Sequence, residues 1–436
     1  MFTAPRGTID ILPDDQPYWQ FLRHCIEQVT ALFGYQRIDV PIFEETPLYV
    51  RGVGEGTDIV DKEMYSFKDK GERDLTLRPE FTAGIMRAYL QHGMRTLPQP
   101  VKLHSMGPIF RYERVQAGRY RQHTQFDIEA IGELDPAVDA EIISVAWHLF
   151  RMVGFESLAL QLNSIGCPIC RPTFLNELIA YYNGHLTEIC PDCQHRLERN
   201  PLRVLDCKVD ICQPIIEAAP HTQDYLCPEC REHLVTLCRY LDLLGRKYTM
   251  NHRLVRGLDY YTKTVFEVWA QGIGAQNAVC GGGRYDGLAQ VLGGNYTPGI
   301  GFGSGMERLI LAMKEQKIAI PGLLKPQVAV VYLSAEAKIQ AIELLDALRQ
   351  AGIASSFEFG DRSLKAQLRA ANREGVRYAV LLGEEECQVQ QVTLQNMQGA
   401  GTPQRIAQSE LVSTLQELLR QGENGQDRDP LPSDAG

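Results

Sequence analysis

The chain has 436 residues, of which 44% are apolar and 22% are charged, a balance that is ordinary for a soluble protein of roughly two to four domains. Its formal net charge of −10 excludes binding of nucleic acid through the overall field, so any such contact must use local basic patches. No apolar run approaches the roughly 20 residues that span a bilayer, and the first residues lack the layout of a signal peptide. We therefore expect a cytoplasmic protein without membrane contact.

The N-terminal part alternates helices with strands. Asp14 and Asp15 provide a start signal for the first apolar stretch with helical spacing, which Gly34 ends. A strand predicted over residues 35–44 contains Pro41, which cannot donate to a β ladder and therefore belongs at an edge or a bulge. A further strand is expected over residues 158–163. The helices are expected over residues 17–33, 79–92 and 137–153.

The composition changes twice along the rest of the chain. Residues 161–245 are helical and rich in cysteine, which predicts an inserted domain. After a linker at 321–326, residues 327–420 alternate strand with helix, the pattern of a small α/β domain with a mostly parallel sheet. The polar tail at 421–436 is expected to be disordered. Strand-like segments between these parts cover residues 254–270, 280–288 and 299–305.

Residues 108–132 are the most informative segment, because they predict a β-hairpin with one apolar and one polar face. The return strand alternates apolar Phe126, Ile128 and Ala130 with polar Gln125, Asp127 and Glu129. The connecting loop carries Gly118 and four basic side chains, namely Arg114, Arg119, Arg121 and His123. Cations at the tip and carboxylates at the base suggest a site where a phosphate-bearing ligand meets an amine. The alternative is a half-exposed hairpin with a solvated face.

Two shorter segments add polar groups that a simple core does not need. Glu80 lies at a strand-to-helix transition, where it either binds a cationic amine or only complements the helix dipole. Arg256 precedes the adjacent pair Tyr260 and Tyr261, which cannot both face the core of a one-sided sheet because adjacent strand residues face opposite ways.

A glycine-rich strand leads into a helix near residue 305. Its four glycines, spaced by two along one face, are Gly299, Gly301, Gly303 and Gly305. A planar group such as a nucleobase fits against a face without side chains, although close packing of a helix on the sheet explains glycines equally well. Arg308 follows at the start of the helix, where an arginine stacks on a base or pairs with phosphate.

Together these segments resemble the histidyl-tRNA synthetases, a family of class II aminoacyl-tRNA synthetases. Residues 110–132 resemble motif 2 of that class, residues 299–313 resemble motif 3, and residues 34–44 are similar to the dimer-forming motif 1. The histidine-specific segments of the family match residues 254–268 and 280–288, and its usual opening matches residues 5–13.

The resemblance implies an α+β catalytic domain built on a mostly antiparallel sheet, formed by residues 1–160 and 246–320. The helical, cysteine-rich insertion at 161–245 would interrupt it, and residues 327–420 would form an α/β anticodon-binding domain. The implied reaction activates L-histidine with ATP to histidyl-adenylate and pyrophosphate, and then transfers histidine to the 3′ end of tRNA(His). The implied assembly is a homodimer.

Residue roles also follow from the resemblance. Arg111 and Arg256 would contact the α-phosphate of ATP, Arg308 would clamp the γ-phosphate, and Glu113 would lie near adenine. Mg2+ would serve the β- and γ-phosphates. Tyr260 and Tyr261 would complete the imidazole pocket. The full histidine-binding set would be Glu80, Phe81, Thr82, Arg111, Gln125, Glu129, Arg256, Tyr260 and Tyr261.

Nine of the twelve cysteines fall between Cys167 and Cys238, and six of these form three C-x-x-C pairs. In a cytoplasmic chain such pairs suggest structural Zn2+ bound by thiolates, and two pairs suffice for one tetrahedral site. The pairs we select as ligands are Cys190 with Cys193 and Cys227 with Cys230. The alternative is reduced, partly buried thiols. In either case we expect the insert to cover the acceptor arm of the tRNA.

Two other protein classes compete with this interpretation. The regulatory subunit of ATP phosphoribosyltransferase shares the synthetase-like fold and senses histidine, but it lacks an anticodon domain. A zinc-dependent nucleic-acid adaptor would make the cysteines primary and leave the hairpin and the glycine-rich strand without a purpose.

Overall fold

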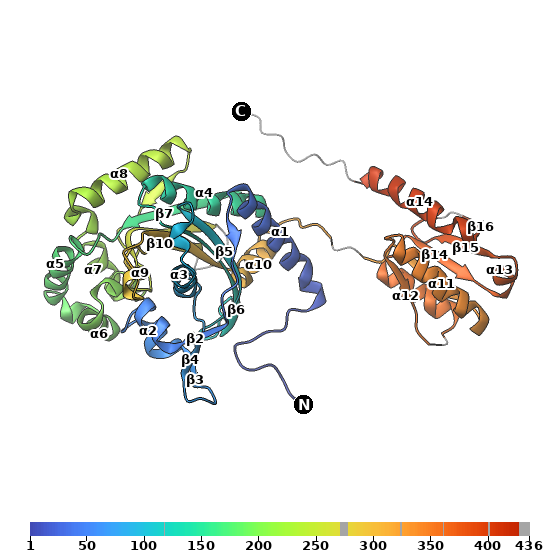
Figure 1. The fold of residues 1–436 in the computed structure, drawn as a ribbon, viewed down its shortest axis with the longest axis horizontal. Helices are drawn as coiled ribbons and strands as arrows, with labels where there is room; N and C mark the ends of the chain where they lie inside the picture. Colours follow the sequence, from blue (N-terminus) through green and yellow to red (C-terminus); the bar gives the residue numbers. More distant parts are fainter. Residues whose placement is uncertain (117, 271–277, 323–324, 361, 400–401, 427–436) are drawn as a thin grey trace. The chain divides into compact units, whose positions relative to one another are not determined.

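The computed structural model describes residues 1–436 except 117, 271–277, 323–324, 361, 400–401 and 427–436, and for 422–426 only the backbone is considered (Figure 1). The chain forms two compact units, Met1–Pro321 and Gly322–Gly436. Within the described ranges, no helix is both long and apolar enough to cross a bilayer.

An eight-stranded sheet organises the first unit, in the order β1-β5-β6-β11-β10-β9-β7-β8. Only the pairs β1–β5 and β7–β8 are parallel, so the expected mostly antiparallel sheet is confirmed. Its strands are β1 (Gln36–Arg37), β5 (Val101–Phe110), β6 (Gln122–Ile131), β7 (Leu158–Ser164), β8 (Tyr248–Met250), β9 (Thr262–Ala270), β10 (Ala278–Arg284) and β11 (Gly299–Gly305).

Four helices cover one face of this sheet and form the main core with it. They are α1 (Gln16–Leu32), α4 (Pro136–Val153), α8 (Pro228–Leu243) and α10 (Met306–Glu315). The apolar set of β6 faces this core as predicted: Phe126, Ile128 and Ala130 are each at most 1% exposed. The ring centroids of Phe126 and Phe302 lie 5.9 Å apart, so β6 and β11 pack together on the face that the helices cover. The other face of the sheet is therefore free to carry polar groups.

A separate three-stranded sheet, in the order β2-β4-β3, is formed by the chain between β1 and β5. Its strands are β2 (Phe43–Glu45), β3 (Tyr65–Lys68) and β4 (Asp74–Leu77), and helices α2 (Thr46–Val53) and α3 (Thr82–Gln91) flank it. The strand predicted over 35–44 is thus wrong as one element, because its two ends pair in different sheets on either side of Pro41.

The insert contributes three helices of its own, α5 (Arg171–Asn183), α6 (Pro191–Arg199) and α7 (Gln213–Glu217). They surround a second core that contains Phe174, Leu178 and Tyr182. By contrast, α8 packs on the main sheet, so the end of the cysteine-rich stretch shares the core of the large sheet. The short helix α9 (Leu288–Val291) follows β10.

The second unit is an α/β domain with a five-stranded sheet, in the order β13-β12-β14-β15-β16. The first three strands are parallel and the last two antiparallel, so the predicted mostly parallel sheet is right for one side only. Its strands are β12 (Val328–Tyr332), β13 (Ser355–Phe357), β14 (Tyr378–Leu382), β15 (Gln391–Asn396) and β16 (Gln404–Ala407). Its helices are α11 (Ala335–Gln350), α12 (Leu364–Glu374), α13 (Glu384–Gln388) and α14 (Leu411–Gln426).

The tail predicted to be disordered from residue 421 is helical in its first part. Helix α14 continues to Gln426, because apolar Leu411, Leu415 and Leu419 keep its spacing and anchor it in the core of the second unit. The rest of the predicted tail, 427–436, lies outside the described residues, as do 323–324 of the predicted linker.

Candidate active site

The polar row of β6 faces a floor without side chains. Residues directly opposite each other in an antiparallel pair point to the same side of a sheet. The three polar residues of β6 lie opposite three glycines of β11, in the pairs Gln125–Gly305, Asp127–Gly303 and Glu129–Gly301. On the next strand, Gly281 and Gly283 pair with Gly303 and Gly301 and extend the floor.

These glycines make room for the polar side chains around them. A Cβ at Gly301 would collide with the carboxylate of Glu129, and one at Gly303 would collide with the amide of Gln125. A Cβ at Gly281 would lie against the guanidinium of Arg256. Packing of a helix does not explain these positions, because the nearest atoms belong to the site itself.

Glu129 is the most enclosed carboxyl group of the row. It is 1% exposed, and its two oxygens accept hydrogen bonds from Thr82 Oγ1 at 2.6 Å and from Tyr285 OH at 2.5 Å. Burial, and then the nearby Asp127, raise the pKa of Glu129 well above its ordinary value. Burial also raises the pKa of Asp127 to about 8, and Gln125 Nε2 donates to its Oδ1 at 2.7 Å. A cationic ligand would allow these acids to ionise.

Glu80 serves as a helix cap and leaves one oxygen available. Its Oε1 accepts a hydrogen bond from the backbone of Ala83 at 2.9 Å, at the start of α3. Its Oε2 is buried and has no hydrogen-bond partner among the described residues. One oxygen therefore complements the helix, and the binding of an amine by the other stays a prediction.

The two tyrosines lie before β9, not on it. Strand β9 begins at Thr262, so the strand predicted from residue 254 is wrong for its first eight residues, where the chain runs as a loop. The ring centroids of Tyr260 and Tyr261 are 4.7 Å apart, and Tyr260 lies 5.9 Å from Tyr285. Tyr285, which reaches Glu129, was not selected from the sequence. Its place two residues after the glycine run 281–283 was the available signal.

Arg256 lies over the glycine floor and pairs with a strand residue. Its Nη1 donates to Glu267 Oε1 at 2.5 Å, and Trp269 Nε1 holds the other oxygen of Glu267 at 2.8 Å. The Nε of Arg256 is buried and has no hydrogen-bond partner within the described ranges. An anion at this position would satisfy it.

Arg111 and Glu113 follow β5 and do not lie on it, because the strand ends at Phe110. Arg111 Nε donates to the carbonyl oxygen of Pro79 at 2.7 Å, and its Nη1 is 3.9 Å from Glu113. Glu113 also lies 3.6 Å from Arg119 of the hairpin loop. The outgoing strand of the predicted hairpin therefore ends before Arg111 and Glu113.

Several cations converge beside the hairpin. The pKa of His123 is lowered to about 4, mainly by burial. The positive charges of Arg111, Arg308 and Arg119 lower it further. Arg308 Nη1 also donates to the carbonyl oxygen of Ala278 at 3.4 Å. The structure thus brings Arg111 and Arg308 to one electropositive region, as an anionic ligand requires.

The cysteines group differently from the prediction. Cys227 and Cys230 lie with Cys167 and Cys170, here named the first cysteine cluster, and Cys190 and Cys193 lie with Cys207 and Cys212, the second cysteine cluster. In each cluster, one ligand atom per residue lies within 4.8 Å of all the others. The predicted combination of Cys190 and Cys193 with Cys227 and Cys230 is wrong, because the end of β7 brings Cys167 to the start of α8.

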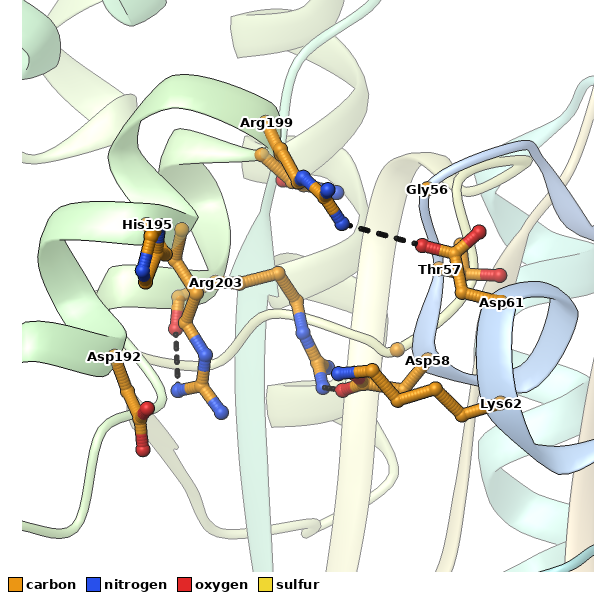
Figure 2. Close-up of a pocket in the computed structure, with 12 residues that line it drawn as sticks. Gly56, Thr57, Asp58, Asp61, Lys62, Asp192, His195, Arg199 and Arg203 are labelled. Atoms are coloured by element: carbon orange, nitrogen blue, oxygen red, sulfur yellow. Dashed lines mark hydrogen bonds and ion pairs between the residues drawn. The ribbon is translucent and has the colours of Figure 1, made fainter.

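A cavity of about 390 Å³ separates α6 from residues 56–62 (Figure 2). Arg199 and Arg203 reach across it from the insert to Asp61 and Asp58, at 3.7 and 3.2 Å. No pattern in the sequence indicates this cavity, because its two walls are far apart in the chain. It shares no lining residue with the polar row of the sheet.

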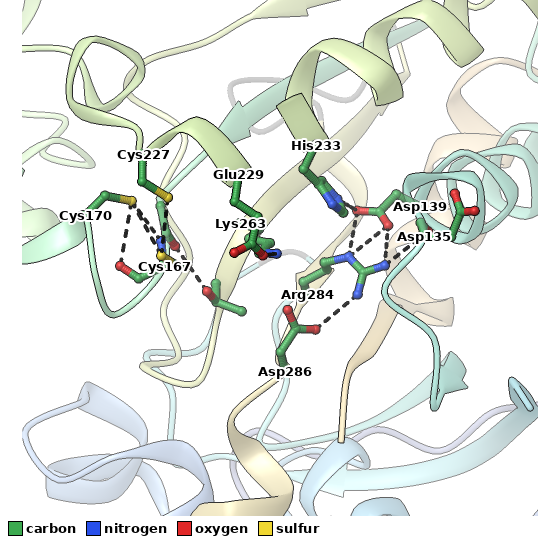
Figure 3. Close-up of polar contacts among 12 residues, drawn as sticks. Asp135, Asp139, Cys167, Cys170, Cys227, Glu229, His233, Lys263, Arg284 and Asp286 are labelled. Carbon is green, nitrogen blue, oxygen red and sulfur yellow. Dashed lines mark hydrogen bonds and ion pairs between the residues drawn. The ribbon is translucent and has the colours of Figure 1, made fainter. Parts of the chain in front are cut away.

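A buried ion network supports the sheet beneath the glycine floor (Figure 3). Arg284 and Asp139 are both 0% exposed, and Arg284 Nη2 lies 2.7 Å from Asp139 Oδ2. His233 Nε2 of α8 lies 3.1 Å from Asp139 Oδ1, and Asp286 Oδ1 lies 3.1 Å from Arg284 Nη1. Burial opposes ionisation of Asp139, yet Arg284 and His233 hold its pKa below its ordinary value. The network joins α4, β10 and α8, which lie far apart in sequence.

The resemblance to class II aminoacyl-tRNA synthetases implies this arrangement, in which a polar hairpin and converging arginines lie over an antiparallel sheet and an α/β unit follows in the chain. The family model described as histidyl-tRNA synthetase matches residues 7–168 and 214–309, and the model described as anticodon binding domain matches residues 327–418. The chain therefore belongs to the histidyl-tRNA synthetase family, the histidine–tRNA ligases.

Individual relatives agree with this assignment. A histidine–tRNA ligase of Dehalococcoides mccartyi is 52% identical over 92% of this chain and 96% of its own length. One from Desulforamulus reducens is 50% identical over 94% and 98%, respectively. The crystal structure of the apo histidyl-tRNA synthetase of S. aureus superposes with a TM-score of 0.80 at 36% identity, covering 95% of this chain and 99% of the other. The expected family and fold class are thereby confirmed.

Proposed function

We propose that the glycine-floored face of the large sheet activates L-histidine with ATP, forming histidyl-adenylate and pyrophosphate, and then transfers histidine to the 3′ end of tRNA(His). One observation carries the proposal. Two buried polar atoms of opposite character, Glu80 Oε2 and Arg256 Nε, have no partner among the described residues. Arg256 lies over Gly281 of the floor, and Glu80 is close enough to Glu129, over Gly301, to raise its pKa. An aminoacyl-adenylate presents an amine to the first and a phosphate to the second.

Histidine would bind at the carboxylate end of the row. Glu80 and Glu129, with Thr82 and Gln125, would take its α-amino group and ring nitrogens, while Tyr260 and Tyr261 would enclose the imidazole. Phe81, which is 0% exposed, would form an apolar wall. Analogues without the two ring nitrogens would leave these buried groups unpaired, which explains selectivity.

ATP would bind at the cationic end, with Glu113 near adenine. Arg111 and Arg256 would hold the α-phosphate from two sides while the carboxylate of histidine attacks phosphorus, and Arg308 would hold the γ-phosphate as pyrophosphate leaves. Fixed arginines stabilise the negative charge that gathers in this transition state, with little reorganisation. Mg2+ bound with ATP would neutralise the β- and γ-phosphates.

The remaining parts of the chain would serve tRNA and assembly. Residues 327–420 would bind the anticodon stem-loop, and the insert at 161–245 would cover the acceptor arm, with structural zinc in the insert. The catalytic domain would comprise 1–160 and 246–320. Residues 34–44 would contribute to a homodimer that works in the cytoplasm.

The sensing alternative is disfavoured by the second unit. A regulatory subunit that only binds histidine has no use for an anticodon-binding domain, and residues 327–418 match that domain. The retained Arg256 over its glycine floor also points to chemistry on a phosphate rather than to sensing.

Histidine-dependent exchange of pyrophosphate into ATP tests the proposed function. We expect exchange with histidine and none with other amino acids. Glu129→Gln should abolish most of it, while the matched variant Glu141→Gln, at an ion pair of α4 with Lys102 away from the site, should keep it. Tight histidine binding without exchange would instead favour the sensor.

A further inference from the structure

The thiols of both cysteine clusters have the spacing of zinc ligands. A tetrahedron of sulfurs at the usual Zn–S distance of about 2.3 Å has edges of about 3.8 Å. In the first cluster, Cys167 Sγ lies 3.7 Å from Cys170 Sγ and 3.8 Å from Cys227 Sγ. In the second, the pairs Cys190–Cys207 and Cys193–Cys212 are both 3.9 Å apart. A disulfide would need about 2.05 Å instead.

We propose that each cluster binds one structural Zn2+, and that the zinc of the first cluster positions the loop that carries Tyr261. Four thiolates and no open position make each site closed, which is the arrangement of structural and not of catalytic zinc. The first part of the proposal stands without any assumption about activity. The second part rests on the proposed function, because it assigns Tyr261 to the histidine pocket.

Backbone groups already point at the sulfurs as they do around metal-bound thiolates. The N–H of Cys167 donates to Cys170 Sγ at 3.2 Å, and that of Cys190 donates to Cys212 Sγ at 3.2 Å. Cys170 and Cys227 of the first cluster are the N-cap residues of α5 and α8. Their N-termini favour negative charge, which the thiolates would supply.

Two cations accompany the first cluster. Four thiolates around one Zn2+ leave a net charge of about −2, which is costly to bury without compensation. Arg171 directly follows Cys170 and lies near three of the thiols. Lys263 reaches the first turn of α8, between Cys227 and Cys230, where its Nζ donates to Glu229 Oε1 at 2.6 Å (Figure 3). The surroundings therefore suit an anionic metal centre.

The same arginine connects the first cluster to the active-site loop. Arg171 Nη2 donates to the carbonyl oxygen of Tyr261 at 2.6 Å, while its Nε and Nη2 hold the carbonyl oxygens of Ile165 and Gly166 at 3.1 and 3.2 Å. Thr262 Oγ1 also donates to the carbonyl oxygen of Gly166 at 3.1 Å. The chain after Tyr261 is thus fixed to the turn that precedes Cys167.

The second cluster has a different connection. Gln213 Nε2 donates to the carbonyl oxygen of Cys207 at 3.0 Å, and Arg253 Nη2 donates to Gln213 Oε1 at 2.6 Å. Among the described residues, Arg253 makes no hydrogen bond to Tyr260 or Tyr261, so the second cluster meets the tyrosine loop only through the apolar core that they share. The two arginines, Arg171 and Arg253, therefore form a matched pair for comparison.

Metal content tests the first part of the proposal. The full chain, purified without chelators and dialysed extensively, should retain about two zinc ions per chain by elemental analysis and native mass spectrometry. Cys227→Ser with Cys230→Ser should remove one ion, as should Cys190→Ser with Cys193→Ser. Zinc well below one equivalent in the folded wild-type chain, or a mass that shows disulfides, would overturn the proposal. Because this readout uses no substrate, its failure is distinct from failure of the proposed function.

Arg171→Gln tests the second part, because it keeps every ligand. We expect two zinc ions to remain while the KM for histidine in pyrophosphate exchange rises about tenfold and that for ATP stays unchanged, as outer groups of metal sites typically contribute 10–100-fold. Arg171→Lys should restore part of the loss, and Arg253→Gln should leave the KM for histidine unchanged. Equal effects of Arg171→Gln and Arg253→Gln would refute the link to Tyr261. A loss of zinc with Arg171→Gln would do the same.

Discussion

Gly281 lies beneath the guanidinium of Arg256, and a methyl group at this position tests what that arginine does. In Gly281→Ala, the added Cβ would lie less than 3 Å from three atoms of the Arg256 guanidinium. Carbon contacts relax at about 3.5–4.0 Å, so the guanidinium must move by about 1 Å and its 2.5 Å contact with Glu267 must lengthen. A displacement of about 1 Å at a reacting centre costs about 100-fold in rate.

The assay is histidine-dependent exchange of pyrophosphate into ATP, with histidine binding measured separately by calorimetry. We expect kcat to fall about 100-fold and the histidine Kd to change by no more than about threefold. Gly287→Ala is the matched control, since its φ of −88° is ordinary and an added Cβ meets no atom within 4 Å. An exchange rate equal to that of the control would refute the role of Arg256, and so would equal losses in binding and rate.

Three further outcomes follow from the same structure. Asp139→Asn leaves Arg284 as a buried, poorly compensated charge, so the free energy of unfolding should fall by about 3 kcal/mol. Tryptophan fluorescence in urea measures this change, because all three tryptophans lie in residues 1–321. Burial raises the pKa of Asp127 to about 8, so this carboxyl group is mostly protonated at pH 7, and a bound amine favours its ionised form. Histidine binding should therefore release protons, and the affinity for histidine should increase from pH 6 to 8. Calorimetry in buffers of different ionisation enthalpy measures this release, and its absence would contradict the prediction. Thr82→Val removes the 2.6 Å donor to Glu129 and should raise the KM for histidine about tenfold without changing that for ATP.

Local periodicity predicted the faces of the site correctly. Strand residues alternate with a period of two, so Phe126 and Glu129 could be assigned to opposite faces without knowing any partner strand. The spacing of Gly301 and Gly303 likewise identified one face of β11. These features depend on neighbours in sequence, which is why the sequence was sufficient for them.

Features that depend on distant contacts were not predictable in the same way. The C-x-x-C spacing identifies pairs, but which pairs combine depends on where the chain returns, so Cys227 meets Cys167 and not Cys190. Tyr285 became a partner of Glu129 only through the order of strands in the sheet. The loop before Thr262 was mistaken for strand because its apolar residues pack into the core of the insert rather than onto the sheet.

The order of strands also has a consequence for synthesis of the protein. β11 is the last strand of the large sheet to leave the ribosome, yet it joins β6 to β10 and so connects the two halves of the sheet. Roughly 170 residues separate Ile131 from Gly299, and at about 5–20 residues per second their translation takes about 10–30 s. During that time β6 presents an unpaired edge, which is prone to aggregation. Slow codons between residues 131 and 299 should therefore increase dependence on chaperones, whereas slow codons before residue 122 should not.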